Sequence, residues 1–136
     1  MGNSTRLEHV AIAVSDLEAA VELYRAMLGR AESGREEIEA EQVRAAFFDL
    51  GGSRLELLEA TQADSPVGRF IDRHGPGLHH IALEVEDLEL ALQRCRAAGM
   101  ETVGRAPRQG ASGRSVAFLH PKGTGGILIE LSQAAG

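Results

Sequence analysis

The sequence predicts an α+β protein built from two tandem modules, each with the element order βαβββ. Residues 7–28 (LEHVAIAVSDLEAAVELYRAML) align without gaps to residues 78–99 (LHHIALEVEDLELALQRCRAAG), and ten of the twenty-two positions are identical. In both segments an alternating apolar stretch is followed by apolar residues at helical spacing. A repeat of about half the chain is typical of two copies of one structural unit.

The first module is predicted to open with a strand and a helix. Val10, Ile12 and Val14 form the apolar face of the strand, while His9 lies on the other face. The helix is predicted from five residues at helical spacing, which are Leu17, Ala20, Val21, Tyr24 and Leu28. Ser15 and Glu18 have the spacing of a capping box, so we expect the helix to start there. Further strands are expected near 31–39, 41–51 and 53–60.

The second module repeats this order after a linking helix. Asp64, Ser65 and Pro66 give a helix-start signal, and Asp87 is placed to cap the second module's own helix. Its later strands are expected near 100–105, 114–121 and 125–133. We therefore expect a single domain over residues 1–136, with module one at about 6–62, the linking helix at about 64–75 and module two at about 77–133.

Composition excludes several classes of function. The chain has 136 residues, of which 43% are hydrophobic and 25% charged, and its net charge is −6. There is no basic cluster, which argues against a nucleic-acid partner. No apolar run reaches 18 residues and the first ten residues lack the apolar core of a signal peptide, so no membrane partner is expected. With Cys95 as the one cysteine, a cytoplasmic location is the simplest expectation.

Two histidines and two glutamates occupy equivalent positions in the modules. His9 aligns with His80, whereas the adjacent His79 falls on the face of Ile81 and Leu83. The last strands, SRLELLEA and GILIELSQ, align Glu56 with Glu130. Two modules related by a pseudo-two-fold axis would bring the four side chains together. Two imidazoles and two carboxylates suit Zn²⁺, Co²⁺, Mn²⁺ or Ni²⁺ with positions left for a substrate.

Longer segments carry a resemblance to a known family. HVAIAVSDLEAAVELYRAMLG, ELLEATQADSPVGRFIDRHGPGLHHIALEVEDL and FLHPKGTGGILIELSQ resemble the methylmalonyl-CoA epimerases of the vicinal oxygen chelate (glyoxalase-like) superfamily. The resemblance implies a cupped, eight-stranded mixed sheet, a divalent metal that is often cobalt, an acyl-CoA substrate and a homodimer. It carries over His9, His80 and Glu130 as metal ligands, and Glu56 stands where the family has Glu or Gln.

The implied reaction moves a proton at C2 of a malonyl thioester, so a proton must be handled on each face of that carbon. Some relatives carry an additional carboxylate where this chain has Ala45 and Ala46. The remaining candidates for proton transfer are Glu56 and Glu130, with His120 as the alternative.

Two further segments are candidates for substrate contacts. In the loop RQGASGRS (108–115), the backbone N–H groups around Ser112 and Gly113 are expected near the substrate carboxylate, although the loop could equally be a plain hairpin turn. His120 and Lys122, in HPKGTGG, are expected to contact the substrate, and Lys122 would meet a phosphate of coenzyme A.

Three other functions compete with epimerisation. A glyoxalase-type isomerase, of the lactoylglutathione lyase kind, would use the same ligands on a glutathione hemithioacetal. A metal-free small-molecule-binding protein of the same fold would not need the four ligands. An Fe(II) ring-cleaving dioxygenase usually needs two histidines, one glutamate and a larger chain.

Overall fold

The computed structural model describes residues 4–135, apart from the side chain of residue 105. The helices in this part are α1 Leu17–Leu28, α2 Pro66–His74 and α3 Leu88–Ala97, and none is both long and apolar enough to span a membrane. The strands are β1 Thr5–Ala13, β2 Gly34–Ile38, β3 Val43–Asp49, β4 Arg54–Ala60, β5 Gly77–Val85, β6 Thr102–Gln109, β7 Ser115–Leu119 and β8 Ile129–Gln133. The order βαβββ–α–βαβββ predicted from the sequence is confirmed.

The chain divides into two compact units. Residues 9–79 form the N-terminal unit, and residues 80–136 with residues 1–8 form the C-terminal unit. In the N-terminal unit the strand order is β2-β3-β4-β1, with β1 parallel to β4 and the other two pairs antiparallel. The C-terminal unit has the order β5-β8-β7-β6 with the same pattern of directions. The internal repeat in the sequence is thus a repeat of sheet topology.

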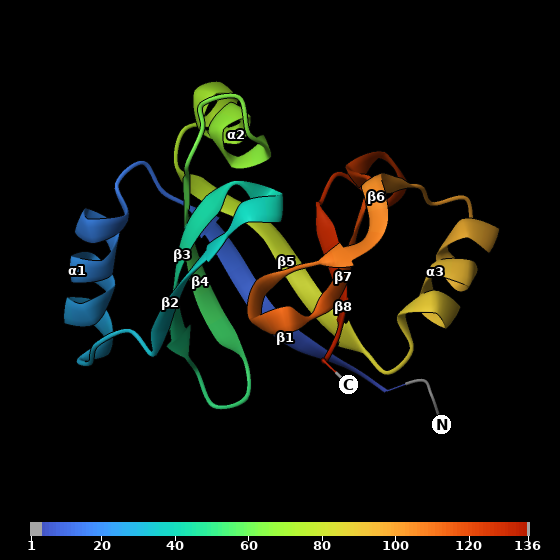
Figure 1. Ribbon diagram of the computed structural model, residues 1–136, viewed down its shortest axis with the longest axis horizontal. Helices are drawn as coiled ribbons and strands as arrows, with labels where there is room; N and C mark the ends of the chain where they lie inside the picture. The colour runs from blue at the N-terminus through green and yellow to red at the C-terminus, as the bar shows by residue number, and fades with distance from the viewer. Residues whose placement is uncertain (1–3, 136) are drawn as a thin grey trace. The chain divides into compact units, whose positions relative to one another are not determined.

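Helix α1 covers one face of the N-terminal sheet, and Figure 1 shows it in blue beside β2, β3 and β4. Leu17 and Val21 are buried and pack with Phe48 and Leu57 from the strands. Burying a side chain of this size contributes roughly 1.5–3 kcal/mol. This apolar face is formed by alternate strand residues, so the intervening residues project from the other face of the sheet.

Helix α3 has the same role in the C-terminal unit. Its residues Leu88 and Leu92 are buried against Ala117 of β7 and Leu131 of β8. Phe118 and Glu130, one residue away along each strand, therefore project from the face opposite α3.

The helix starts differ in one respect from the expectation. The N-cap of α1 is Asp16 rather than Ser15, because Asp16 has extended backbone angles (φ −140°, ψ 107°) and its side chain accepts a hydrogen bond from the Ala19 N–H. A side-chain oxygen in this position satisfies one of the otherwise unpaired N–H groups of the first turn. Asp87 caps α3 in the same way, as predicted, and accepts from the Leu90 N–H.

Strand β6 is longer than expected and begins later, at Thr102 rather than near residue 100. Gly104 and Pro107 suggested a strand that ends near residue 105, but the strand continues to Gln109 with a change of register between Val103 and Arg108. Proline is tolerated here because β6 is the last strand in the order of its unit, where one side of the backbone has no partner strand.

Candidate metal-binding and active site

In the N-terminal unit a histidine and a glutamate meet on the face of the sheet opposite α1. Ala11 of β1 lies directly opposite Glu56 of β4, and His9 is two residues before Ala11 on the same face. Nδ1 of His9 lies 3.1 Å from Oε2 of Glu56, and both side chains are 3% exposed. The small side chain of Ala11 leaves space between the parallel strands for the longer groups.

The C-terminal unit repeats this arrangement at equivalent positions. Ala82 of β5 lies opposite Glu130 of β8, and His80 is two residues before Ala82. Nε2 of His80 lies 3.0 Å from Oε1 of Glu130, and both side chains are buried. The repeat therefore extends to register, burial and pairing, although the two histidines present different ring nitrogens.

The adjacent His79 has different surroundings. Its ring meets Phe70 of α2 edge-on at 5.0 Å between ring centroids, and the side chain is half-buried. Phe70 also lies 4.9 Å from His74 on its own helix. Since successive strand residues point to opposite faces, His79 packs against α2 while His80 meets Glu130.

Each glutamate also faces an aromatic ring that carries an arginine. Phe47 of β3 lies opposite Glu56, and Phe118 of β7 lies opposite Glu130. The Arg54 guanidinium carbon is 4.4 Å from the Phe47 ring centroid, and its Nη2 lies 3.1 Å from Oε2 of Glu56. In the C-terminal unit the Arg108 guanidinium carbon is 5.1 Å from the centroid of Phe118.

The sequence analysis missed both arginines. Arg54 could have been found, because it is two residues before Glu56 in a strand and so shares its face. Arg108 could not, because the register change in β6 determines which of its residues face the site.

The donor types fit a divalent metal ion. A buried carboxylate is costly unless a charge, a hydrogen bond or a metal compensates it, and each unit holds one beside a buried imidazole. Neutral imidazole nitrogen and carboxylate oxygen are ligands for ions such as Zn²⁺ and its transition-metal neighbours.

Other residues predicted from the sequence lie in turns of the C-terminal unit. The His120 Nδ1 accepts a hydrogen bond from the Lys122 N–H at 3.0 Å, and both residues line a hollow of about 380 Å³. Ser112 and Gly113 are exposed in a 3₁₀ turn between β6 and β7, and both have left-handed backbone angles (φ 58° and 71°). The structure thus pairs His120 with Lys122 and places the loop residues in a hairpin connection.

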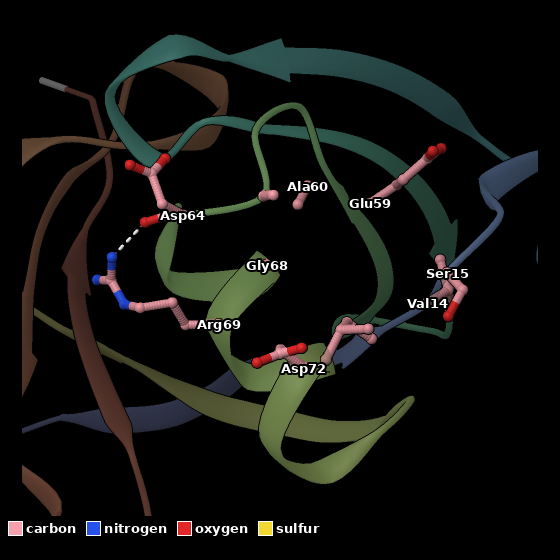
Figure 2. Close-up of a pocket in the computed structure, with 10 residues that line it drawn as sticks. Val14, Ser15, Glu59, Ala60, Asp64, Gly68, Arg69 and Asp72 are labelled. Atoms are coloured by element: carbon pink, nitrogen blue, oxygen red, sulfur yellow. Dashed lines mark hydrogen bonds between the residues drawn. The ribbon is translucent and has the colours of Figure 1, made fainter.

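A hollow of about 560 Å³ in the N-terminal unit contains none of the predicted site residues. Figure 2 shows that α2 lines it together with residues at the ends of β1 and β4, and that Arg69 donates a hydrogen bond to the Asp64 carbonyl. Glu59 and Asp72 contribute further charged groups. The size of a hollow is therefore a poor guide to the chemistry here, which lies with the His–Glu pairs.

Comparison with known proteins identifies the family. The sequence profile of the Glyoxalase/Bleomycin resistance protein/Dioxygenase superfamily matches residues 8–118. The chain belongs to this superfamily. Within it, the chain is 44% identical over 131 residues to the ethylmalonyl-CoA/methylmalonyl-CoA epimerase of Cereibacter sphaeroides, covering 94% of this chain and 97% of the relative.

Solved structures agree with this assignment. A Streptomyces coelicolor methylmalonyl-CoA epimerase variant in complex with 2-nitronate-propionyl-CoA superposes with a TM-score of 0.91 at 39% identity, covering 96% of this chain and 95% of that chain. A methylmalonyl-CoA epimerase in complex with methylmalonyl-CoA and NH₄⁺ gives the same TM-score and identity, over 97% and 96% of the two chains. The resemblance to these epimerases and the glyoxalase fold class predicted from the sequence are both confirmed.

The superfamily member described here departs from some relatives at Ala45. Ala45 of β3 lies opposite Leu58 and shares the face of Phe47 and Glu56, whereas Ala46 contributes to the core beneath α1. Ala45 is therefore the position from which a carboxylate would project beside Glu56. Glu36 of β2 lies directly opposite Ala45 on the same face.

Proposed function

We propose that this chain is a methylmalonyl-CoA epimerase, which removes the C2 proton of methylmalonyl-CoA and returns a proton to the opposite face. The observation that carries the proposal is the repeated, buried His–Glu pair at identical register in the two units. Relatives at 39–44% identity over nearly the whole chain bear that name, and one of them is bound to methylmalonyl-CoA.

The metal would be held by His9, Glu56, His80 and Glu130. The support is the donor types, their burial and the internal repeat that relates the two pairs. Cobalt is the ion we favour from the family resemblance, and Zn²⁺, Mn²⁺ and Ni²⁺ suit the same donors. When bound, such an ion supplies electrostatic stabilisation of the negative charge that develops on the thioester oxygen, which is worth several kcal/mol of barrier.

The proton transfers are assigned to Glu56 and Glu130. One carboxylate takes the C2 proton from one face and the other returns a proton to the opposite face. Arg54 holds Oε2 of Glu56 at 3.1 Å, which orients that carboxylate and leaves its other oxygen for the substrate. His120 is the alternative base, and its engagement with the Lys122 N–H makes it less available for proton transfer.

The remaining substrate contacts are proposed in the C-terminal unit. The exposed backbone at Ser112 and Gly113 would face the acyl group, and the His120–Lys122 turn would contact the coenzyme A portion. Two copies of the chain are proposed to associate as a homodimer, on the family resemblance.

The test is proton–deuterium exchange at C2 of methylmalonyl-CoA in D₂O, after metal analysis of the purified protein. We expect exchange that depends on the added divalent ion and proceeds together with epimerisation. A glyoxalase-type isomerase would instead convert the glutathione hemithioacetal of methylglyoxal, so the same preparation is assayed with that compound. Turnover of the hemithioacetal without C2 exchange would refute the epimerase proposal.

A further inference from the structure

We infer that Arg108 binds the free carboxylate of the malonyl group and so selects acyl-CoA substrates that carry one. This inference rests on the proposed function and adds a specificity residue to it. Arg108 lies on the edge strand β6, opposite Val116 of β7. Val116 and Phe118 share a face, and Phe118 lies opposite Glu130. Arg108 therefore stands on the same face of the C-terminal sheet as the glutamate of the His80 pair.

The contacts of Arg108 distinguish it from the other half-buried arginines. Arg54 pairs with Glu56, and Arg114 pairs with Glu8 and Glu84. Arg108 stacks on Phe118 but has no carboxylate within ion-pair distance among the residues that the structure describes. In a chain of net charge −6, a sheltered guanidinium without a carboxylate partner is unusual. An anionic ligand would supply that partner.

Buried polar atoms on this face support the presence of a polar ligand. The Nε of Arg108 and the Oγ of Ser132 are both buried without a hydrogen-bond partner in the described part of the chain. Ser132 lies opposite Val116 and two residues after Glu130, so it shares the face of Arg108. Orphan buried groups are rare in folded proteins and often mark an unoccupied ligand position.

The position of Arg108 favours the acyl carboxylate over a coenzyme A phosphate. Its guanidinium carbon lies 5.1 Å from the Phe118 ring centroid, and that ring meets His80 edge-on, also at 5.1 Å. Only one side chain therefore separates the guanidinium from a proposed metal ligand. The malonyl carboxylate is attached directly to C2, whereas the pantetheine arm separates the phosphates from the acyl group. The planar guanidinium also matches a carboxylate in a bidentate pair.

The experiment compares the binding of three ligands by calorimetry, using the full-length protein loaded with cobalt. The ligands are methylmalonyl-CoA, propionyl-CoA, which lacks the free carboxylate, and coenzyme A. We expect Arg108→Met to weaken methylmalonyl-CoA binding by about tenfold to a hundredfold, the range for a lost charge-assisted pair. Propionyl-CoA and coenzyme A should change by less than about threefold, because they lack the group that Arg108 recognises.

Two other variants complete the test. Arg108→Lys keeps the charge without the planar fork, so it should recover part of the methylmalonyl-CoA affinity and none of the other two need recover. Arg94→Met removes the same charge from the exposed surface of α3 and should leave all three affinities unchanged. If Arg108→Met does not fold, Arg108→Gln serves for the same comparison.

Three outcomes would overturn the inference. An equal loss for all three ligands would place Arg108 on the coenzyme A portion, and no loss for any ligand would remove it from the site. A wild-type protein that neither binds methylmalonyl-CoA nor exchanges its C2 proton would refute the proposed function, and the inference with it. Wild-type exchange with unaffected Arg108 variants would refute the inference alone.

Discussion

At the scale of single residues, the adjacent histidines have different roles because a strand alternates its side chains. His79 packs against Phe70 of α2, and His80 pairs with the carboxylate of Glu130. His80 is 4% exposed, so its ring is sheltered from water and its second nitrogen has few alternatives to a specific partner. The same two residue types in succession therefore provide a packing contact and a metal ligand.

Replacing each histidine separately tests this assignment. We expect His80→Ala to lose the bound metal, from about one ion per chain to almost none, because it removes one of four ligands from a buried site. His79→Ala should keep the metal and lose only some stability at its contact with Phe70. Metal content is measured by inductively coupled plasma mass spectrometry, with circular dichroism as the check of folding. Loss of metal from the His79 variant and its retention in the His80 variant would reverse the assignment.

The residues at the site were predictable to the extent that they depend on alternation and on the repeat. His9, His80, Glu56 and Glu130 follow from two aligned segments, and the structure pairs them within each unit. The arginine–aromatic contacts depend on which strands are neighbours and in what register. No local pattern specifies that register, and for Arg108 it also depends on an irregularity in β6.

At the scale of elements, helices and hairpins were easier to predict than edge strands. Helix α1 has the predicted extent because five apolar residues hold one helical face and Gly29 supplies the left-handed C-cap (φ 72°). Strand β6 was predicted too short, since glycine and proline weaken a strand pattern without excluding an edge strand. Local propensity thus fails where tertiary pairing compensates for poor strand-forming residues.

The connection between α1 and β2 is held by a charge network centred on Glu32. Glu32 accepts from Arg35 of β2 at 2.9 Å and from Arg25 of α1 at 2.8 Å, and Arg35 also pairs with Glu18. The hydrogen bond from the Arg35 side chain is the main reason that the pKa of Glu32 falls from 4.5 to about 2. A carboxyl with a lowered folded-state pKa stabilises the fold above its unfolded pKa, and that stabilisation is lost as the pH falls toward 2.

The Glu32→Gln variant tests the network through its pH dependence. At pH 7 we expect the free energy of unfolding to fall by about 0.5–1 kcal/mol, because both arginine partners are well exposed and solvent screens the pairs. The difference from wild type should shrink through the window from pH 4.5 to 2, as wild-type Glu32 also becomes neutral. Urea unfolding at several pH values measures it. Glu37→Gln on the exposed side of β2 is the control, and a deficit independent of pH would argue against the charge network.

At the scale of the whole molecule, the two units share one plan with small asymmetries. Each contains a parallel pair of strands, a buried His–Glu pair and an arginine stacked on the ring opposite the glutamate. Arg54 contacts its glutamate, whereas Arg108 has no carboxylate partner in the described chain. A repeated fold thus offers two similar carboxylates with different surroundings, which suits a reaction that handles one proton on each face of a carbon.

The asymmetry leads to the last prediction, which concerns Glu56→Gln and Glu130→Gln. Glutamine keeps an oxygen ligand but removes the basic carboxylate, so each variant should retain substantial metal and lose at least about a hundredfold in the rate of epimerisation. If each carboxylate serves one face of C2, each variant should still exchange the C2 proton of one epimer with solvent and lose exchange for the other. The two variants should differ in which epimer is affected. The measurement is deuterium incorporation into each epimer separately, with metal content determined on the same samples. Metal-loaded variants that epimerise at near wild-type rates would place the bases elsewhere, and His120→Ala would then be the next variant to measure.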